Sequence, residues 1–288
     1  MGHIRRTLIG MLAVLLLLGG CASARVETED GDDLNVEIIA LNVGKADAIL
    51  VRLGENDYLI DTGLKKQFDT LKDALDTLGV THIAGLFLTH TDKDHGGGMV
   101  KLAESGIQID AIYASELYAE KDYDKHQAVK AADALDMEVT WLTAGDTIDA
   151  GNGCTFEVLG PLSVDTEDEN NNSLVLRLTT PEGTALFMGD AELEEEAEVI
   201  ARSADKLDVD YLKVAHHGRD DATSAALAYM VSPQIAVIST DRTDEPRSAA
   251  TSVIASLEDA GATVYITELF ELGVRVRLKD GQAELIAE

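Results

Sequence analysis

Apolar residues recur along this 288-residue chain in two patterns that predict different elements. Runs of consecutive or alternating apolar residues are typical of strands, whereas apolar residues at every third or fourth position are typical of helices. The first pattern predicts strands over residues 36–43, 48–53, 58–60, 83–88, 111–114, 139–142, 155–159, 174–178, 185–188, 211–215, 235–239, 264–266 and 274–278. The second predicts helices over residues 68–78, 126–135, 192–202, 222–230 and 250–260.

Strands and helices alternate through both halves of the chain, and no proline-rich linker or change in composition divides it. This order favours a layered α/β architecture. We therefore expect one domain over residues 35–288, an αββα four-layer sandwich in which two similar sheets face each other and helices cover the outside. The run at 83–88 is continuously apolar, which predicts a strand buried on both faces.

The first 20 residues have the pattern of an export signal. Arg5 and Arg6 precede an apolar run over residues 9–18, which is too short to span a bilayer. The small residues before Cys21 resemble the lipobox of bacterial lipoproteins. That resemblance implies a lipoprotein signal peptide over residues 1–20, lipid attachment at Cys21, and anchoring to the outer face of the bacterial cell membrane. The alternative is a plain secretory signal that is cleaved within residues 22–24.

Acidic residues outnumber basic ones by 53 to 23, which gives a formal net charge of -30. Loss of residues 1–20 would remove two arginines and no acid, so the charge would become -30 - 2 = -32. A chain of this charge repels nucleic acid and anionic lipid as a whole, and the sequence contains no run of lysines or arginines. Residues 21–34 are short, polar and acidic, so we expect a flexible tether there.

The predicted strand at 83–88 ends in a group of histidines and aspartates: His90, Asp92, Asp94 and His95. Imidazole and carboxylate groups are ligands for zinc, manganese and iron. Four such groups within six residues can face one site only if the backbone turns sharply, which the glycines over 96–98 permit. The alternative is that the two aspartates only cap a helix.

Two further strands end in residues of the same kinds, with Asp190 after the run at 185–188 and His216 and His217 after the run at 211–215. Ligand sites in layered α/β folds lie at such strand ends. Three strand ends supply enough ligands for two divalent metal ions, zinc or manganese, and such a pair activates water for hydrolysis. Asp61, at the end of another strand, either orients a metal ligand or caps a turn.

Two further histidines, His82 and His126, and Cys154 are expected to lie outside the metal site. We expect His82, just before a buried strand, to be structural. His126 has charged neighbours, so we expect a solvated position at the surface. Cys154 lies among apolar residues and is expected to be a small core residue.

Six ordered motifs resemble the metallo-β-lactamase superfamily, and in detail the extracytoplasmic nuclease-like domain of ComEC/Rec2 competence proteins. They lie at residues 41–48, 59–63, 88–97, 171–176, 188–190 and 216–218. The resemblance implies that His90 and Asp92 bind one metal ion and that Asp94 and His95 bind the second. It also implies that Asp190 bridges the two ions and that Asp94 and Asp61 take part in catalysis.

The resemblance leaves the last ligand open between His216 and His217. We favour His216 because it directly follows the strand.

The chain departs from the family pattern at several positions. Asp92 stands where the wider superfamily has histidine, and the family's isolated histidine is replaced within residues 170–172, which makes Asn172 a candidate contact. Fewer nitrogen ligands shift the first site toward manganese or weaken it. Arg219 stands where serine is usual, and Glu245 where a histidine precedes proline, so substrate contacts differ.

These features predict an exported metal-dependent hydrolase, in the first place a phosphodiesterase acting on nucleic acid or on a smaller phosphodiester. The overall acidity opposes binding of long nucleic acid, although Arg219, Arg242 and Arg247 could contact a phosphate. One alternative is a hydrolase of an ester, lactone or β-lactam. Another is a non-catalytic metal-binding surface protein that is accessory to DNA uptake.

Overall fold

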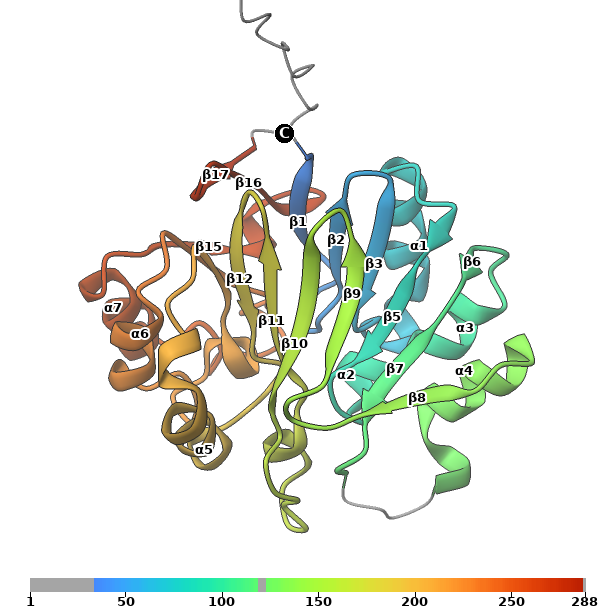
Figure 1. Cartoon of the computed structure of the whole chain (residues 1–288), viewed down its shortest axis with the longest axis horizontal. Helices are drawn as coiled ribbons and strands as arrows, with labels where there is room; N and C mark the ends of the chain where they lie inside the picture. The colour runs from blue at the N-terminus through green and yellow to red at the C-terminus, as the bar shows by residue number, and fades with distance from the viewer. Residues whose placement is uncertain (1–33, 119–122, 287–288) are drawn as a thin grey trace, which may run out of the picture. The chain divides into compact units, whose positions relative to one another are not determined.

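Two β-sheets pack face to face in the computed structural model, which describes residues 34–118 and 123–286 (Figure 1). The first sheet has the strand order β17-β16-β1-β2-β3-β5-β7-β8. Its strands are β1 Val36–Leu41, β2 Ile49–Leu53, β3 Asn56–Ile60, β5 Gly85–Leu88, β7 Ile112–Ser115, β8 Val139–Leu142, β16 Gly273–Lys279 and β17 Gln282–Leu285.

The second sheet has the strand order β15-β14-β13-β12-β11-β10-β9. Its strands are β9 Thr147–Gly151, β10 Cys154–Gly160, β11 Val175–Thr180, β12 Gly183–Phe187, β13 Tyr211–Lys213, β14 Ile235–Ile238 and β15 Thr263–Ile266. A small additional sheet pairs β4 His82–Ile83 with β6 Gln108–Ile109.

Parallel pairing in the middle of each sheet places several strand ends at one edge. Strand β5 pairs in parallel with β3 and β7, and β13 pairs in parallel with β12 and β14. The residues that follow β3, β5, β12 and β13 therefore leave their sheets at the carboxyl ends of neighbouring strands, where ligand sites of layered α/β folds lie.

The core between the sheets is built from the apolar inner faces of both. Phe87 of β5 packs against Phe156 of β10 with ring centroids 5.0 Å apart, and Tyr58 lies 5.2 Å from the same Phe156 ring. All residues of β5 are buried, which confirms the prediction from its continuous apolar run. Cys154 is fully buried in this core, as predicted, and burial raises the pKa of its thiol to about 11.

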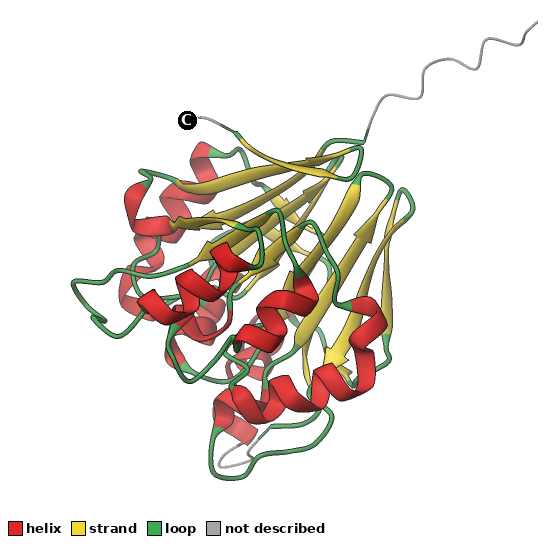
Figure 2. Cartoon of the chain, turned by 90° about the vertical axis from the view of Figure 1, so that its left-hand side faces the viewer, coloured by secondary structure: helices red, strands yellow, loops and turns green. Residues whose placement is uncertain are grey.

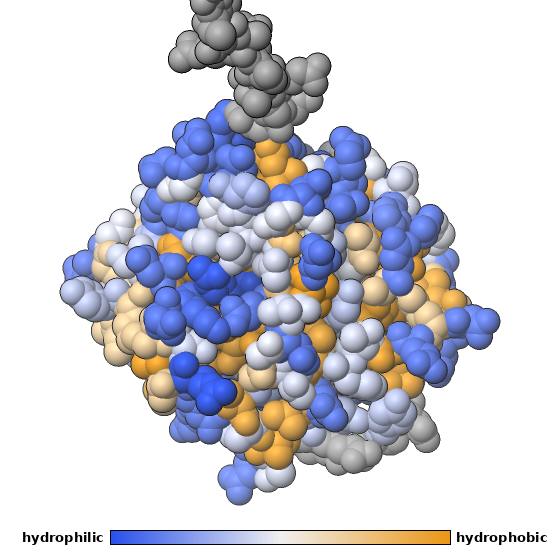
Figure 3. Space-filling view, viewed as in Figure 1, coloured by the Kyte–Doolittle hydropathy of each residue, from blue (hydrophilic) through white to orange (hydrophobic). Residues whose placement is uncertain are grey.

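Helices cover the outer face of each sheet. The first sheet is covered by α1 Phe68–Thr77, α3 Met99–Ala103 and α4 Gln127–Leu135, and the second by α5 Leu193–Ser203, α6 Ala225–Val231 and α7 Thr251–Asp259 (Figure 2). The short helix α2 Lys93–Gly96 lies between β5 and α3 in the chain. This helix–sheet–sheet–helix order confirms the predicted αββα sandwich. The face seen in Figure 1 carries hydrophilic and hydrophobic residues side by side (Figure 3).

The elements that the sequence did not predict are short or lie at sheet edges. Residues of β9 and β17 are mostly exposed or half-buried, so they lack the apolar runs of the central strands. Helix α3 has only five residues. Helix α6 begins later than predicted, at Ala225, because the hydroxyl of Ser224 caps it by accepting a hydrogen bond from the backbone N–H of Leu227 at 3.1 Å.

The prediction for His126 was wrong, because this residue is buried with 6% of its surface exposed. Its ring packs edge-on against Trp141, with centroids 5.3 Å apart, and against Tyr118 at 4.9 Å. Burial lowers the pKa of the imidazole to about 4. In contrast, His82 is half-exposed and its Nε2 lies 2.7 Å from a carboxylate oxygen of Asp110.

The predicted signal peptide 1–20, Cys21 and all but the last residue of the predicted tether 21–34 lie outside the described residues. Across residues 34–118 and 123–286, none of the helices has the length and apolar character that a bilayer crossing requires.

Candidate metal centre

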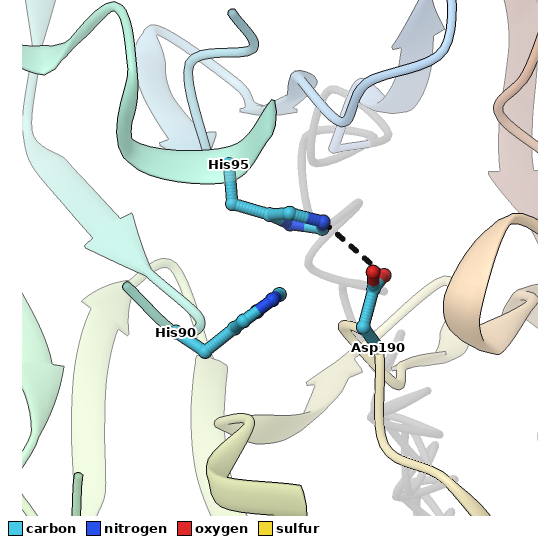
Figure 4. A group of neighbouring side chains, drawn as sticks. All are labelled: His90, His95 and Asp190. Atoms are coloured by element: carbon cyan, nitrogen blue, oxygen red, sulfur yellow. Dashed lines mark ion pairs between the residues drawn. The ribbon is translucent and has the colours of Figure 1, made fainter. Parts of the chain in front are cut away.

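The ends of three central strands bring histidine and aspartate side chains into one buried cluster. The segment after β5 supplies His90, Asp94 and His95, the turn after β12 supplies Asp190, and the turn after β13 supplies His217. His90, His95 and Asp190 point into a common space (Figure 4). Each of these groups therefore lies in a polar turn directly after a buried apolar strand.

Short distances join the members of this cluster. The Nε2 atom of His95 lies 3.2 Å from Oδ1 of Asp190. The Nε2 atom of His217 lies 3.5 Å from Oδ2 of Asp94 and 3.5 Å from Oδ2 of Asp190. The two oxygens of Asp190 thus face different histidines, which is the arrangement that a bridging carboxylate requires. The ligand atoms of His90, His95 and Asp190 all lie within 4.8 Å of one another, as do those of Asp94, His95 and His217.

Hydrogen bonds on the far side of two rings fix their orientation. Nδ1 of His95 donates to a carboxylate oxygen of Asp61 at 2.7 Å, and Nδ1 of His217 donates to the backbone carbonyl of Ser239 at 2.8 Å. With Nδ1 protonated, the lone pair of each ring lies on Nε2 and points into the cluster.

Several buried ligand atoms make no hydrogen bond within the described part of the chain and face only one another. Nε2 of His90, His95 and His217 and Oδ1 of Asp190 are all buried without a hydrogen bond. Buried polar atoms almost always make hydrogen bonds, so this concentration of atoms without one is consistent with a site for a cation. Neutral imidazoles and carboxylates in this arrangement fit divalent cations such as zinc or manganese.

Asp61 contacts the Nδ1 side of the His95 ring, away from the cluster, and so does more than cap a turn. One of its oxygens accepts the backbone N–H of Thr89 at 2.8 Å, and the other accepts the Thr89 hydroxyl at 2.7 Å as well as the His95 ring. Asp61 itself has a positive φ of 61°, a conformation that few non-glycine residues adopt and that concentrates at functional sites. Its position is that of a residue that orients a metal ligand.

Electrostatic coupling within the cluster favours charged aspartates. Burial by itself would raise the pKa of Asp190 and Asp94, but the neighbouring imidazoles of His95 and His217 hold both values below their usual range. Burial and the nearby His95 lower the pKa of His90, which keeps that ring neutral. Although burial opposes it, Asp190 and Asp61 raise the pKa of His95.

The structure groups His217 with Asp94, His95 and Asp190, whereas the sequence favoured His216, which lies with Glu192 and Asp221. Both residues have positive φ, 44° for His216 and 53° for His217, and this left-handed turn reverses the chain directly after β13. The ring of His216 consequently faces elsewhere. Its Nδ1 lies 2.9 Å from Oδ1 of Asp221 and 3.1 Å from Oε1 of Glu192, and its Nε2 is 3.9 Å from Asp190.

Asp92 and Asn172 do not join the cluster in this structure. Asp92 is exposed at the start of α2 and belongs to none of the potential ligand groups among the described residues. Asn172 is buried, but its amide is bonded to the backbone N–H and C=O of Asp165 at 2.7 and 2.8 Å. The Ser173 hydroxyl lies by His90 instead, 3.4 Å from Nδ1, and accepts the backbone N–H of Asp190 at 3.0 Å.

Three charged residues at the centre were missed as site residues. Asp47 is 1% exposed, and one of its oxygens lies 2.7 Å from Nζ of Lys213, which is equally buried. The other oxygen lies 3.7 Å from Nδ1 of His217. Lys45 forms an ion pair with Asp94. A lysine inside the apolar run at 211–215 was the signal that could have revealed this network, because a buried lysine needs a carboxylate partner.

Arg219, a predicted substrate contact, lies beside this centre. Its guanidinium forms an ion pair with Asp221 at 2.6 Å, and Asp221 in turn contacts His216. The arginine is therefore held by a carboxylate that borders the turn carrying His217.

An αββα sandwich with a histidine–aspartate cluster at its strand ends defines a metallo-β-lactamase-type protein. Residues 41–241 match the family model described as metallo-beta-lactamase superfamily, and the chain belongs to that superfamily.

Two curated relatives are competence and recombination proteins. The chain is 29% identical over 211 residues to Recombination protein 2 of Haemophilus influenzae, a match that covers 72% of this chain and 24% of the relative. It is 27% identical over 226 residues to Competence protein ComA of Neisseria gonorrhoeae, which covers 78% of this chain and 30% of the relative. The matched region therefore spans less than a third of each relative.

Solved structures with low sequence identity share the fold. CmlA, a diiron β-hydroxylase from Streptomyces venezuelae, superposes with a TM-score of 0.56 at 12% identity and covers 86% of this chain and 54% of its own. Zinc-bound PqqB from Methylobacterium extorquens gives a TM-score of 0.55 at 15% identity. That match covers 83% of this chain and 99% of the PqqB chain. These likenesses concern architecture alone, since the two proteins carry different names and chemistries on one scaffold.

Proposed function

We propose that this chain is a metal-dependent phosphodiesterase that uses two divalent cations, zinc or manganese. The observation that carries the proposal is the convergence, in a buried space, of three imidazole nitrogens and one carboxylate oxygen that make no hydrogen bond within the described part of the chain. Similarity to competence and recombination proteins supports a phosphodiester substrate, because those proteins are named for processes that handle DNA.

The ligand atoms divide between two positions. Asp94, His95 and His217 form one group, and His90 lies on the other side of His95 with Asp190 between the two positions. A single ring nitrogen binds one cation, and we assign His95 to the group with Asp94 and His217, in line with the family resemblance, which implies one ion for Asp94 and His95. The other position then retains His90 and Asp190. With fewer ligands, it binds its cation more weakly.

Bound cations would supply an activated water and would stabilise negative charge on the phosphoryl group. The chain's own residues prepare the site for this chemistry. Asp61 and the Ser239 carbonyl hold two rings with Nε2 inward. Lys213 balances the buried charge of Asp47, and Lys45 places a positive charge at Asp94, next to the space where a phosphate oxygen would lie.

The test replaces Asp190, whose carboxylate faces both positions. We expect Asp190→Asn to reduce metal content and to lower kcat/KM by about 100-fold or more, roughly 2.7 kcal/mol of transition-state stabilisation. The assay measures hydrolysis of single-stranded DNA and of a chromogenic phosphodiester with manganese or zinc, together with bound metal by mass spectrometry. Asp259→Asn, at an exposed position on α7, is the matched control.

Turnover of neither phosphodiester by a protein that binds metal would refute the proposal. Hydrolysis of an ester, lactone or β-lactam under the same conditions would replace it by the corresponding alternative.

A further inference from the structure

A pocket lined by lysines adjoins the metal centre. It has a volume of about 450 Å³ and contains five lysines and one glutamate in its lining, so its lining residues carry 5 - 1 = 4 net positive charges. The chain as a whole carries -30. The lysines of this lysine pocket are Lys65, Lys66, Lys93, Lys101 and Lys130, and the acid is Glu104.

Most of these lysines have no carboxylate partner. Lys101 lies 3.9 Å from Asp69, which is itself highly exposed, and its ammonium group also lies 5.2 Å from the centre of the Phe68 ring. For the other four lysines, the described parts of the chain place no carboxylate oxygen within 4 Å. Unpaired like charges around one cavity repel each other, and an anion in the cavity relieves that repulsion.

The segment over residues 90–95, which carries His90, Asp94 and His95, forms one wall of the lysine pocket. Thr91 and Lys93 line the pocket, and Asp94 and His95, in the same helix α2, belong to the metal centre. Thr91 directly follows His90 in the chain, so this wall of the pocket begins one residue from a candidate metal ligand.

The lining selects phosphate groups and not bases. None of the residues that line the pocket is aromatic, so it offers no surface for base stacking. Ammonium groups bind phosphates as point charges, without sequence preference. A volume of this size is typical of small-molecule sites and fits part of a single strand.

We propose that the lysine pocket binds phosphate groups of a single-stranded phosphodiester chain at positions outside the cleaved bond, and thereby positions the substrate on the metal centre. The identity of the ligand rests on the proposed function, whereas anion binding rests on the charge and shape of the pocket alone.

Binding of a fluorescein-labelled oligothymidylate of about 12 nucleotides to the full chain tests the proposal, since single-strand sites in proteins span up to about 16 nucleotides. Anisotropy is measured between about 0.05 and 0.3 M KCl, in EDTA, so that no turnover occurs. The variant combines Lys65→Ala, Lys66→Ala and Lys130→Ala. Lys93 is kept because it precedes Asp94, and Lys101 because it packs on Phe68.

The control variant combines Lys72→Ala, Lys206→Ala and Lys279→Ala, which lie outside the pocket and remove the same charge. We expect the pocket variant to bind the oligonucleotide about 100-fold more weakly than wild type near 0.1 M salt. The slope of log K against log[KCl] should become shallower by about 2, because each of the three lost phosphate contacts contributes about 0.7. The control should bind within about twofold of wild type.

Equal losses in the two variants, or no binding by wild type, would overturn the proposal. Vesicles of phosphatidylglycerol test a membrane surface as the alternative ligand. The proposal would also be overturned if the pocket variant lost binding to these vesicles, the control variant kept it, and oligonucleotide binding was unchanged. The binding measurement excludes catalysis. If the wild-type protein hydrolysed neither phosphodiester, the enzyme proposal would be refuted, and the binding result would be unaffected.

Discussion

Two adjacent histidines have opposite roles because of one backbone turn. The left-handed conformations of His216 and His217 send the second ring into the metal centre and the first toward Glu192 and Asp221. Adjacent residues of a strand also project to opposite faces, so the residue types and their spacing do not tell which of the two rings faces the candidate metal centre. The conformation costs free energy, and the packing around the turn must hold it.

His126 should make the protein less stable in acid. The folded protein holds its pKa at about 4, below the ordinary value of 6.5, so the unfolded chain binds more protons between these values. Stability is therefore fully present above about pH 6.5 and falls as the pH drops toward 4, by at most about 3 kcal/mol. Urea unfolding of wild type and His126→Leu at several pH values measures this contribution.

The leucine variant should lose less stability than wild type between pH 6.5 and 4. Parallel curves for the two proteins would show that His126 does not titrate in this way.

Helix α2 is held against the rest of the domain by glycines. A Cβ atom at Gly98 would lie 2.4 Å from the backbone oxygen of Thr62, and one at Gly97 would lie 2.6 Å from the backbone nitrogen of Lys65. The glycines after His95 thus permit a close approach of backbone to backbone. This approach anchors the segment that carries Asp94 and His95.

Gly98→Ala should therefore weaken both folding and metal binding. The added methyl group displaces either Thr62 or α2, which costs about 1–3 kcal/mol of unfolding free energy. Chemical denaturation measures that cost, and competition with a chromogenic chelator measures zinc affinity. A variant with the stability and zinc affinity of wild type would contradict the close contact.

Elements and ligands that depend on local sequence could be predicted, whereas contacts between distant segments could not. The apolar runs before Asp61, His90 and Asp190 located the strands and the ends that carry the candidate ligands. The burial of His126 depends on Trp141, which belongs to another element. The lysine pocket likewise was not visible, because its lysines come from the segment before α1 and from α2, α3 and α4.

At the scale of the whole molecule, the charge of -30 should make stability depend on salt. Like charges repel each other more strongly in the compact state, and added salt screens that repulsion over distances beyond about 10 Å at 0.1 M. We expect the Tm to rise by roughly 2–4 °C between low salt and about 0.3 M KCl, which corresponds to about 1 kcal/mol. Calorimetry in EDTA measures this shift, and a Tm that falls with KCl would contradict it.

The described domain begins and ends on strands of the same sheet. Val36 pairs with Leu278, and the last described residues return alongside β16, where Ile286 donates a hydrogen bond to the carbonyl of Arg275 (Figure 1). Both points of entry therefore lie close together, away from the strand ends that carry the metal centre. A domain whose first and last described residues lie at one sheet edge, away from the candidate metal centre, is suited to insertion into a longer polypeptide.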